Sequence, residues 1–116
     1  MPKFTDPFSG TTPDHSLTHQ ELVRAIRLNI AAEHEAIHQY MAHAEVTDHP
    51  LVKKVLIDIA NEERVHIGEF EYLLQLLTGD EDVWVAEGRE EVKEMAEGMD
   101  APSENVPETT LGSLED

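Results

Sequence analysis

Three ionisable side chains occupy positions where a helical pattern predicts apolar residues: Glu33, Glu63 and His66. The last two form a Glu-x-x-His motif, and residues three apart share one face of a helix. A charged group on a face that should be buried is costly unless it is paired, protonated or bound to a metal. Carboxylate oxygens together with imidazole nitrogens suit iron or manganese. The pattern therefore indicates metal binding between packed helices.

A first long helix must position Glu33. Thr18 and Glu21 fit a capping box, which predicts that this helix begins at Thr18. It is expected to end near Thr47, because Pro50 disfavours helical geometry at the residue before it. An apolar stripe runs along this helix at steps of three and four residues, with Glu33 between Ile30 and Ile37. Its other members are Leu22, Ile26, Ile30, Ile37, Tyr40 and Ala44.

A second long helix must position Glu63 and His66. Asp48 suits its cap, Pro50 suits an early helical position, and Gly79 stops it. Its expected stripe consists of Val52, Leu56, Ile59, Phe70, Leu73 and Leu77. A weaker third helix is predicted over Glu90–Glu97. The short connection between the long helices predicts an antiparallel hairpin, so the fold class is all-α.

The register of this hairpin places the three residues at one height. Glu33 lies about 15 residues before the turn and Glu63 about 15 after it, so each is ~22 Å from the turn at 1.5 Å per residue. We expect the two carboxylates side by side, with His66 one turn beyond Glu63. Tyr40 lies on the same stripe, two turns nearer the connection.

Two helices cannot bury both of their stripes alone, so we expect the hairpin to dimerise into a four-helix bundle. A two-fold dimer supplies one Glu from each of two helices and a Glu-x-x-His from each of the other two. This is the ligand pattern of di-iron carboxylate bundles. An alternative is a buried ion-pair layer that sets the dimer register, but the seam contains no cation to pair with Glu33 and Glu63.

A competing motif, His-Glu-x-x-His, spans His34 to His38. In a zinc protease it supplies two ligands and a general base, but this chain is too short and too helical to offer a third ligand and a cleft. Both histidines lie roughly 100–140° around the helix from Glu33. One possibility is that this pair, or His15 and His19, binds a metal at the surface. The alternative is that these histidines are partly exposed helix residues at a subunit interface.

Composition excludes several classes of function. The chain has 116 residues and a formal charge of -17, which would repel duplex DNA and anionic membranes. It has no Cys, so thiolate metal sites and disulfides are impossible. No apolar run is long enough to span a membrane. The N-terminal residues lack the apolar core of a signal peptide, which predicts a cytoplasmic protein.

The predicted organisation has three parts. Residues 1–17 are expected to form a flexible N-terminal arm, residues 18–98 a helical hairpin domain, and residues 99–116 a disordered linker. Residues 79–116 carry -11 of the net charge. This acidic segment is either a solvated tail or a local field that gathers cations.

Over roughly residues 18–97, the chain resembles the encapsulated ferritins, which are short ferritin-like proteins carried inside encapsulin nanocompartments. The resemblance rests on Ala32-Glu33, on Tyr40, on the run from Asn61 to Phe70, and on the later stretch from Glu90 to Glu94. A second match is Leu111-Gly112-Ser113-Leu114, which looks like the encapsulin-targeting peptide. The family resemblance implies a ferritin-like hairpin domain and a ring-shaped decamer built from dimers. Together with the targeting peptide, it implies an encapsulin shell as partner.

The same resemblance implies roles for individual residues. Glu33, Glu63 and His66 match the ligands of the family's ferroxidase centre, and Tyr40 matches the Tyr beside it. Glu35 matches an acidic residue implicated in metal uptake. A second acidic uptake residue of the family corresponds here to Ala32, which departs from the pattern.

The expected function is that of a ferroxidase, which oxidises Fe(II) to Fe(III) with O2 at a di-iron site shared between two subunits and serves iron storage in an encapsulin nanocompartment. In this scheme Tyr40 either hydrogen-bonds a ligand or acts as a redox-active neighbour. One alternative is a metal-binding cargo or iron buffer without catalysis. Another is a rubrerythrin-like peroxidase, which the lack of Cys disfavours because the usual rubredoxin electron donor needs it.

Overall fold

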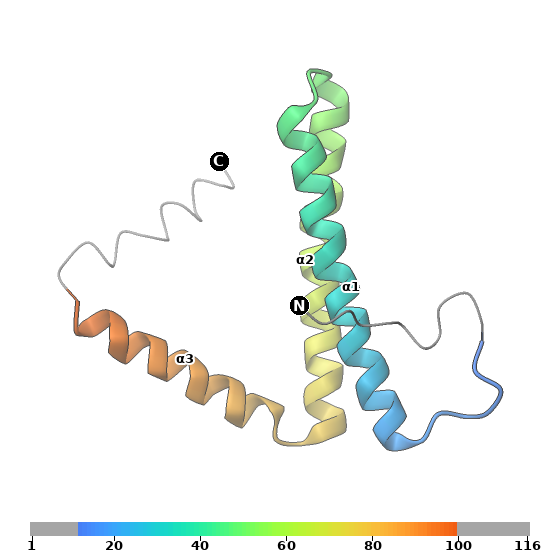
Figure 1. The fold of residues 1–116 in the computed structure, drawn as a ribbon, viewed down its shortest axis with the longest axis vertical. Helices are drawn as coiled ribbons and strands as arrows, with labels where there is room; N and C mark the ends of the chain where they lie inside the picture. The colour runs from blue at the N-terminus through green and yellow to red at the C-terminus, as the bar shows by residue number, and fades with distance from the viewer. Residues whose placement is uncertain (1–11, 100–116) are drawn as a thin grey trace, which may run out of the picture. The chain divides into compact units, whose positions relative to one another are not determined.

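The computed structural model describes residues 12–99 and contains three α-helices in that range: α1 (His19–Val46), α2 (Pro50–Thr78) and α3 (Glu81–Glu97). No strand occurs among these residues, which confirms the all-α prediction (Figure 1). Most of the predicted arm over 1–17, and all of the predicted linker except Met99, lie outside the described residues. No helix between residues 12 and 99 is long and apolar enough to cross a membrane.

Helix α1 begins and ends where the sequence predicts. Thr18 is its N-cap, and the capping box is complete: the Glu21 amide donates to Thr18 Oγ1 at 3.2 Å and the Thr18 amide donates to Glu21 Oε1 at 2.9 Å. His15 extends this network from outside the helix, with Nε2 3.0 Å from Glu21 Oε1. Thr47 is the C-cap.

The start of α2 differs from the prediction by one residue. The N-cap is His49 and not Asp48, and the Val52 amide donates to His49 Nδ1 at 3.3 Å. Pro50 explains the difference. It occupies the first helical position, where its missing N–H costs nothing, and it holds the residue before it in extended geometry. At the other end Gly79 terminates α2 as predicted, in the left-handed region at φ 80°.

Helices α1 and α2 pack along their length as an antiparallel hairpin (Figure 1). The stripe predicted on α1 faces the partner helix. On α2 the prediction is right for Leu56, Phe70 and Leu77 and wrong by one residue at the alternate positions. Ile59, His66 and Leu73 are exposed, and the buried residues are their successors Ala60, Ile67 and Leu74. The true seam of α2 follows alternating steps of four and three and comprises Leu56, Ala60, Glu63, Ile67, Phe70, Leu74 and Leu77.

This hairpin leaves a second apolar stripe uncovered on α2. Val52, Ile59 and Leu73 recur at multiples of seven residues beside the seam and are 43%, 36% and 44% exposed. His66 occupies the remaining position of the same stripe. Large apolar residues in a continuous exposed row are typical of a surface that packs against another helix.

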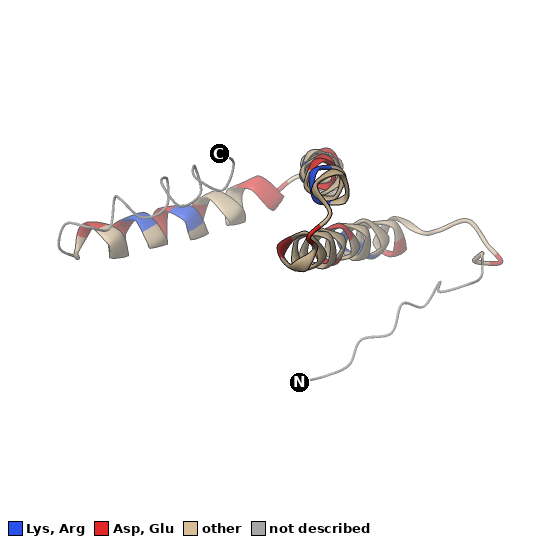
Figure 2. Cartoon of the chain, turned by 90° about the horizontal axis from the view of Figure 1, so that it is seen from above, with Lys and Arg blue, Asp and Glu red and all other residues tan. Residues whose placement is uncertain are grey.

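Helix α3 is longer than predicted, because it begins at Glu81 and not at Glu90. Glu81 and Asp82 place negative charge in its first turn, which favours a helix N-terminus electrostatically. Trp84 Nε1 donates to Asp80 Oδ2 at 3.2 Å and ties the first turn to its cap residue. Acidic residues outnumber basic ones along this helix (Figure 2). The chain divides between Gly79 and Asp80 into two compact units. The hairpin belongs to the first unit and α3 to the second.

Candidate metal centre

Glu33, Glu63 and His66 meet between α1 and α2. His66 Nδ1 lies 2.9 Å from Glu63 Oε1 and 3.1 Å from Glu33 Oε2. One ligand atom from each of the three residues lies within 4.8 Å of the other two. Among residues 12–99 this is the one group of three or more acidic, His or Cys side chains arranged closely enough to hold a single ion.

The backbone explains why these side chains converge. Glu63 belongs to the α2 seam, and His66 follows one turn later on the same side of the helix. Three residues join α1 to α2, so positions equally far from the connection face each other across the hairpin. Glu33 consequently lies opposite Glu63, as the register predicts.

The three-residue cluster is covered on one side and open on the other. The Glu33 and Glu63 side chains are 19% and 15% exposed, whereas His66 is 49% exposed. The carboxylates are thus held between the helices while the imidazole borders the uncovered stripe of α2. A second chain packed on that stripe would close the open side.

The electrostatics of the cluster centre on shared protons. A hydrogen bond between the two carboxyl groups, aided by desolvation, raises the pKa of Glu33. The same hydrogen bond, followed by that with His66, lowers the pKa of Glu63. The hydrogen bond to Glu63 also raises the pKa of His66. Glu33 and His66 therefore keep their protons to a higher pH than usual, whereas Glu63 ionises at a lower pH than usual.

A divalent cation can take the place of these protons. Two carboxylates and one imidazole offer mostly hard oxygen donors, the set that suits Fe or Mn better than a thiolate metal. Such a cation would satisfy both carboxylates at once, which the protons between them do only in part. The donors present therefore fit iron chemically.

The other predicted site residues do not join this cluster. Tyr40 is half-buried on α1, two turns nearer the connection, and Glu35 is exposed. Glu35 is not part of the group of ligand atoms around Glu33, and Tyr40 makes no hydrogen bond to the three clustered residues. Their predicted roles in ligand binding and metal uptake stay predictions, as does the catalytic role of the three clustered residues.

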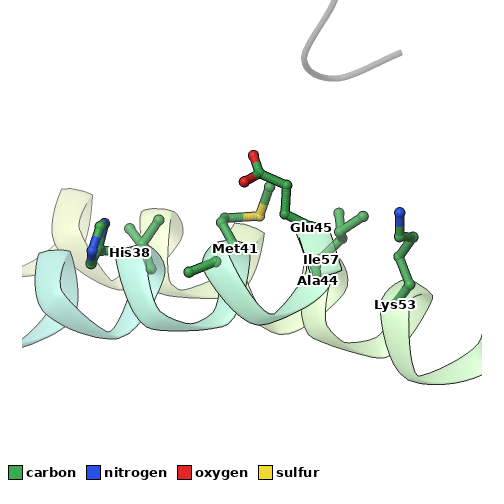
Figure 3. Close-up of a pocket in the computed structure, with 8 residues that line it drawn as sticks. His38, Met41, Ala44, Glu45, Lys53 and Ile57 are labelled. Carbon is green, nitrogen blue, oxygen red and sulfur yellow. The ribbon is translucent and has the colours of Figure 1, made fainter. Parts of the chain in front are cut away.

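A groove that the sequence did not reveal lies nearer the hairpin connection (Figure 3). It has a volume of about 400 Å³, and His38, Met41 and Glu45 of α1 line it opposite Lys53 and Ile57 of α2. None of the three clustered residues lines this groove. Its signal in the sequence is weak, because small Ala side chains at 42 and 44 leave the space between longer neighbours.

Comparisons with known proteins support one family. The family model described as Rubrerythrin matches residues 11–108. The encapsulin nanocompartment cargo protein EncC of Myxococcus xanthus is 37% identical over an alignment of 130 positions that covers 98% of each protein. A ferritin-like–encapsulin shell fusion protein of Pyrococcus furiosus is 40% identical over 88 residues. That match covers 76% of this chain and only 25% of the fusion protein.

A solved structure agrees with these sequence matches. The crystal structure of an encapsulated ferritin domain from Pyrococcus furiosus superposes with a TM-score of 0.71 at 37% sequence identity. The superposition covers 84% of this chain and 98% of that domain.

Proposed function

Because the chain belongs to the rubrerythrin family and to the encapsulated ferritins, and has their ferritin-like fold, we propose that it is a ferroxidase carried as cargo by an encapsulin nanocompartment. In this proposal it oxidises Fe(II) to Fe(III) with O2 at a di-iron site shared between two subunits. The observation that carries the proposal is the convergence of Glu33, Glu63 and His66 within 4.8 Å.

One chain offers three ligand residues, which is half of the set found in di-iron carboxylate bundles. A two-fold partner would bring the other half. The exposed stripe of α2, which runs directly past His66, supports an interface at this place. We therefore infer that the site is completed by dimerisation, and that the dimers assemble further into the ring-shaped decamer that the family resemblance implies.

The residues of this chain bind and prepare the iron substrate. The carboxylates of Glu33 and Glu63 and the imidazole of His66 bind Fe(II) in their deprotonated forms, and the lowered pKa of Glu63 favours the ionised form that attracts the cation. The carboxylates then stabilise the greater positive charge that develops on oxidation. Two Fe(II) ions supply two electrons, so each pair reduces one O2, with two protons, to hydrogen peroxide. Tyr40 is proposed as a neighbour of the centre and Glu35 as an uptake residue, both from the family resemblance.

The cargo role rests on the names of the relatives and on the predicted targeting peptide. Leu111–Leu114 would bind the encapsulin shell, tethered by the linker over 99–116, while residues 18–98 form the ferritin-like domain. These targeting residues lie outside the described part of the chain. In this scheme the protein works inside a nanocompartment in the cytoplasm, and the ferric product accumulates in the shell.

Adding Fe(II) under air to the metal-free full-length protein tests the activity. Ferric absorbance is followed against a protein-free blank, and the fast phase is titrated. We expect a fast phase that ends near about one Fe per chain, because two ions would fill each dimer. Glu63→Ala and His66→Ala should each abolish it. The matched controls Glu62→Ala and His43→Ala change exposed residues of the same types and should leave it intact.

Two results would contradict the proposal in different ways. A fast phase that survives both ligand substitutions would place the chemistry elsewhere. Tight iron binding without any acceleration over the blank would instead leave a metal-binding cargo or iron buffer.

A further inference from the structure

Two exposed histidines, His34 and His38, lie four residues apart inside α1. Among residues 12–99 neither imidazole has a hydrogen-bonding or ionic partner. Residues at this spacing are neighbours on one helix face, with Cβ atoms about 5–6 Å apart. Both imidazoles are thus available to one external ligand.

The other histidine pair with this spacing has a different structure. His15 precedes α1, so it does not share a helix face with His19. Its ring nitrogens are already engaged, Nδ1 by Asp14 at 2.9 Å and Nε2 by Glu21 at 3.0 Å. His34 and His38, by contrast, lie in one continuous helix, and both of their imidazoles are free to bind the same ion.

Their surroundings favour a cation. Met41 and Glu45 follow on the same face at steps of three and four, and with His38 they line one side of the groove described above (Figure 3). The chain as a whole carries a formal charge of -17, which attracts cations, although residues 79–116 hold -11 of it and Lys53 lines the groove across from Glu45. Both histidines lie well inside α1, whose ends are capped at Thr18 and Thr47.

We propose that His34 and His38 form a second metal site, which takes a borderline divalent transition metal such as Ni2+, Cu2+ or Zn2+ through two imidazole nitrogens. Imidazole donors suit these metals, whereas the carboxylate-rich cluster of Glu33, Glu63 and His66 suits harder ions. The two sites therefore differ in the metals they select. Water completes the coordination at the exposed site.

A Ni2+ titration by calorimetry tests this site on the full-length protein. The carboxylate cluster is first removed by Glu33→Gln, Glu63→Gln and His66→Gln, so that remaining binding reports on the second site. We expect about one Ni2+ per chain, and a loss of affinity of at least about tenfold when either His34→Gln or His38→Gln is added. His43→Gln, which changes a lone exposed histidine of the same helix, is the matched control and should have no effect.

A second measurement does not depend on the triple substitution. In the His66→Gln chain, whose carboxylate cluster has no imidazole, Cu2+ should give an electron paramagnetic resonance signal with coupling to two imidazole nitrogens. Adding His34→Gln/His38→Gln should remove it, while adding His43→Gln should retain it. Equal Ni2+ affinity in all three single variants, or an unchanged Cu2+ signal in the double variant, would overturn the proposal.

Discussion

Glu33 of α1 and His66 of α2 lie 33 positions apart in sequence and meet across the hairpin, with 3.1 Å between Oε2 and Nδ1. Both residues have a raised pKa, Glu33 chiefly through its hydrogen bond with Glu63 and His66 chiefly through its own hydrogen bond with Glu63. Each therefore holds its proton to a higher pH than usual. A metal that binds both must displace these protons.

Metal affinity should accordingly rise with pH. The Glu33 carboxyl loses its proton above its ordinary pKa of 4.5, and the His66 imidazole loses its proton above 6.5. We expect the affinity of this cluster for Mn2+, a hard ion, to increase as pH rises through both ranges, with protons released on binding. Calorimetry in buffers of different ionisation enthalpy measures that release. In His66→Gln, the step above pH 6.5 should disappear; an unchanged step would assign the proton to another group.

The metal-free protein should show the opposite trend in stability. The raised pKa of His66 stabilises the folded state fully below pH 6.5, and this contribution is lost as pH rises through the folded pKa. The lowered pKa of Glu63 stabilises above 4.5 and is lost as pH falls through the folded pKa. Between 4.5 and 6.5 both contributions are present.

We therefore expect urea unfolding of the metal-free protein to give higher stability between pH 4.5 and 6.5 than at alkaline pH. The raised pKa of Glu33 acts in the same direction, because ionising that carboxyl disfavours the folded state as pH rises. His66→Gln should reduce the difference between the two pH ranges. If the variant keeps the full difference, the imidazole is not its source.

The uncovered stripe of α2 predicts how assembly can be blocked. Ile59→Glu or Leu73→Glu places a charge in the proposed interface beside His66, so each should shift the protein towards monomers in sedimentation analysis. Val65→Glu is the control, because Val65 is also exposed but lies on the side of α2 opposite buried Ile67. Equal dissociation by Val65→Glu would mean that the effect is one of charge alone.

Gly68 of α2 and Gly79, the C-cap of that helix, should respond to alanine with opposite signs. Gly79 has φ 80°, where an L-residue costs about 1–2 kcal/mol, so Gly79→Ala should destabilise by that amount. Gly68 lies inside the helix, and an added Cβ there meets nothing within 4 Å, so Gly68→Ala should stabilise by about 0.5–1 kcal/mol. Urea unfolding measures both. A destabilising Gly68→Ala would reveal a close contact with another chain.

Local chemistry made much of the hairpin predictable. The capping box at Thr18, the stop at Gly79 and the short connection are each specified by a few neighbouring residues. A short connection fixes the register of the two helices. The contact between Glu33 and Glu63 could therefore be predicted from their equal sequence distance to the connection. The pairing of both with His66 followed from helical periodicity.

The prediction was less accurate where two patterns competed. On α2 the exposed stripe through Ile59 and Leu73 is as apolar as the buried seam, and Ala60 is too small to mark that seam by hydrophobicity. The phase depends on packing against α1, which periodicity in one helix does not contain. The first half of α3 was missed because Gly88 and the β-branched valines lower helix propensity, although Glu81 and Asp82 were a usable signal.

The three-residue connection between α1 and α2 also sets the order in which the hairpin can fold. Contacts beside the turn close the shortest loops and lose the least chain entropy, so helix pairing should spread outwards from that end. The Glu33–Glu63–His66 cluster lies about halfway along this path. The cluster can form once the half of the hairpin nearer the connection, which contains Ala44 and Ala60, has paired. Ile26 and Leu74, in the other half, would pack later. The three clustered residues thus lie at the midpoint of the expected order of helix pairing, and an ion bound by them would hold the hairpin closed in its middle.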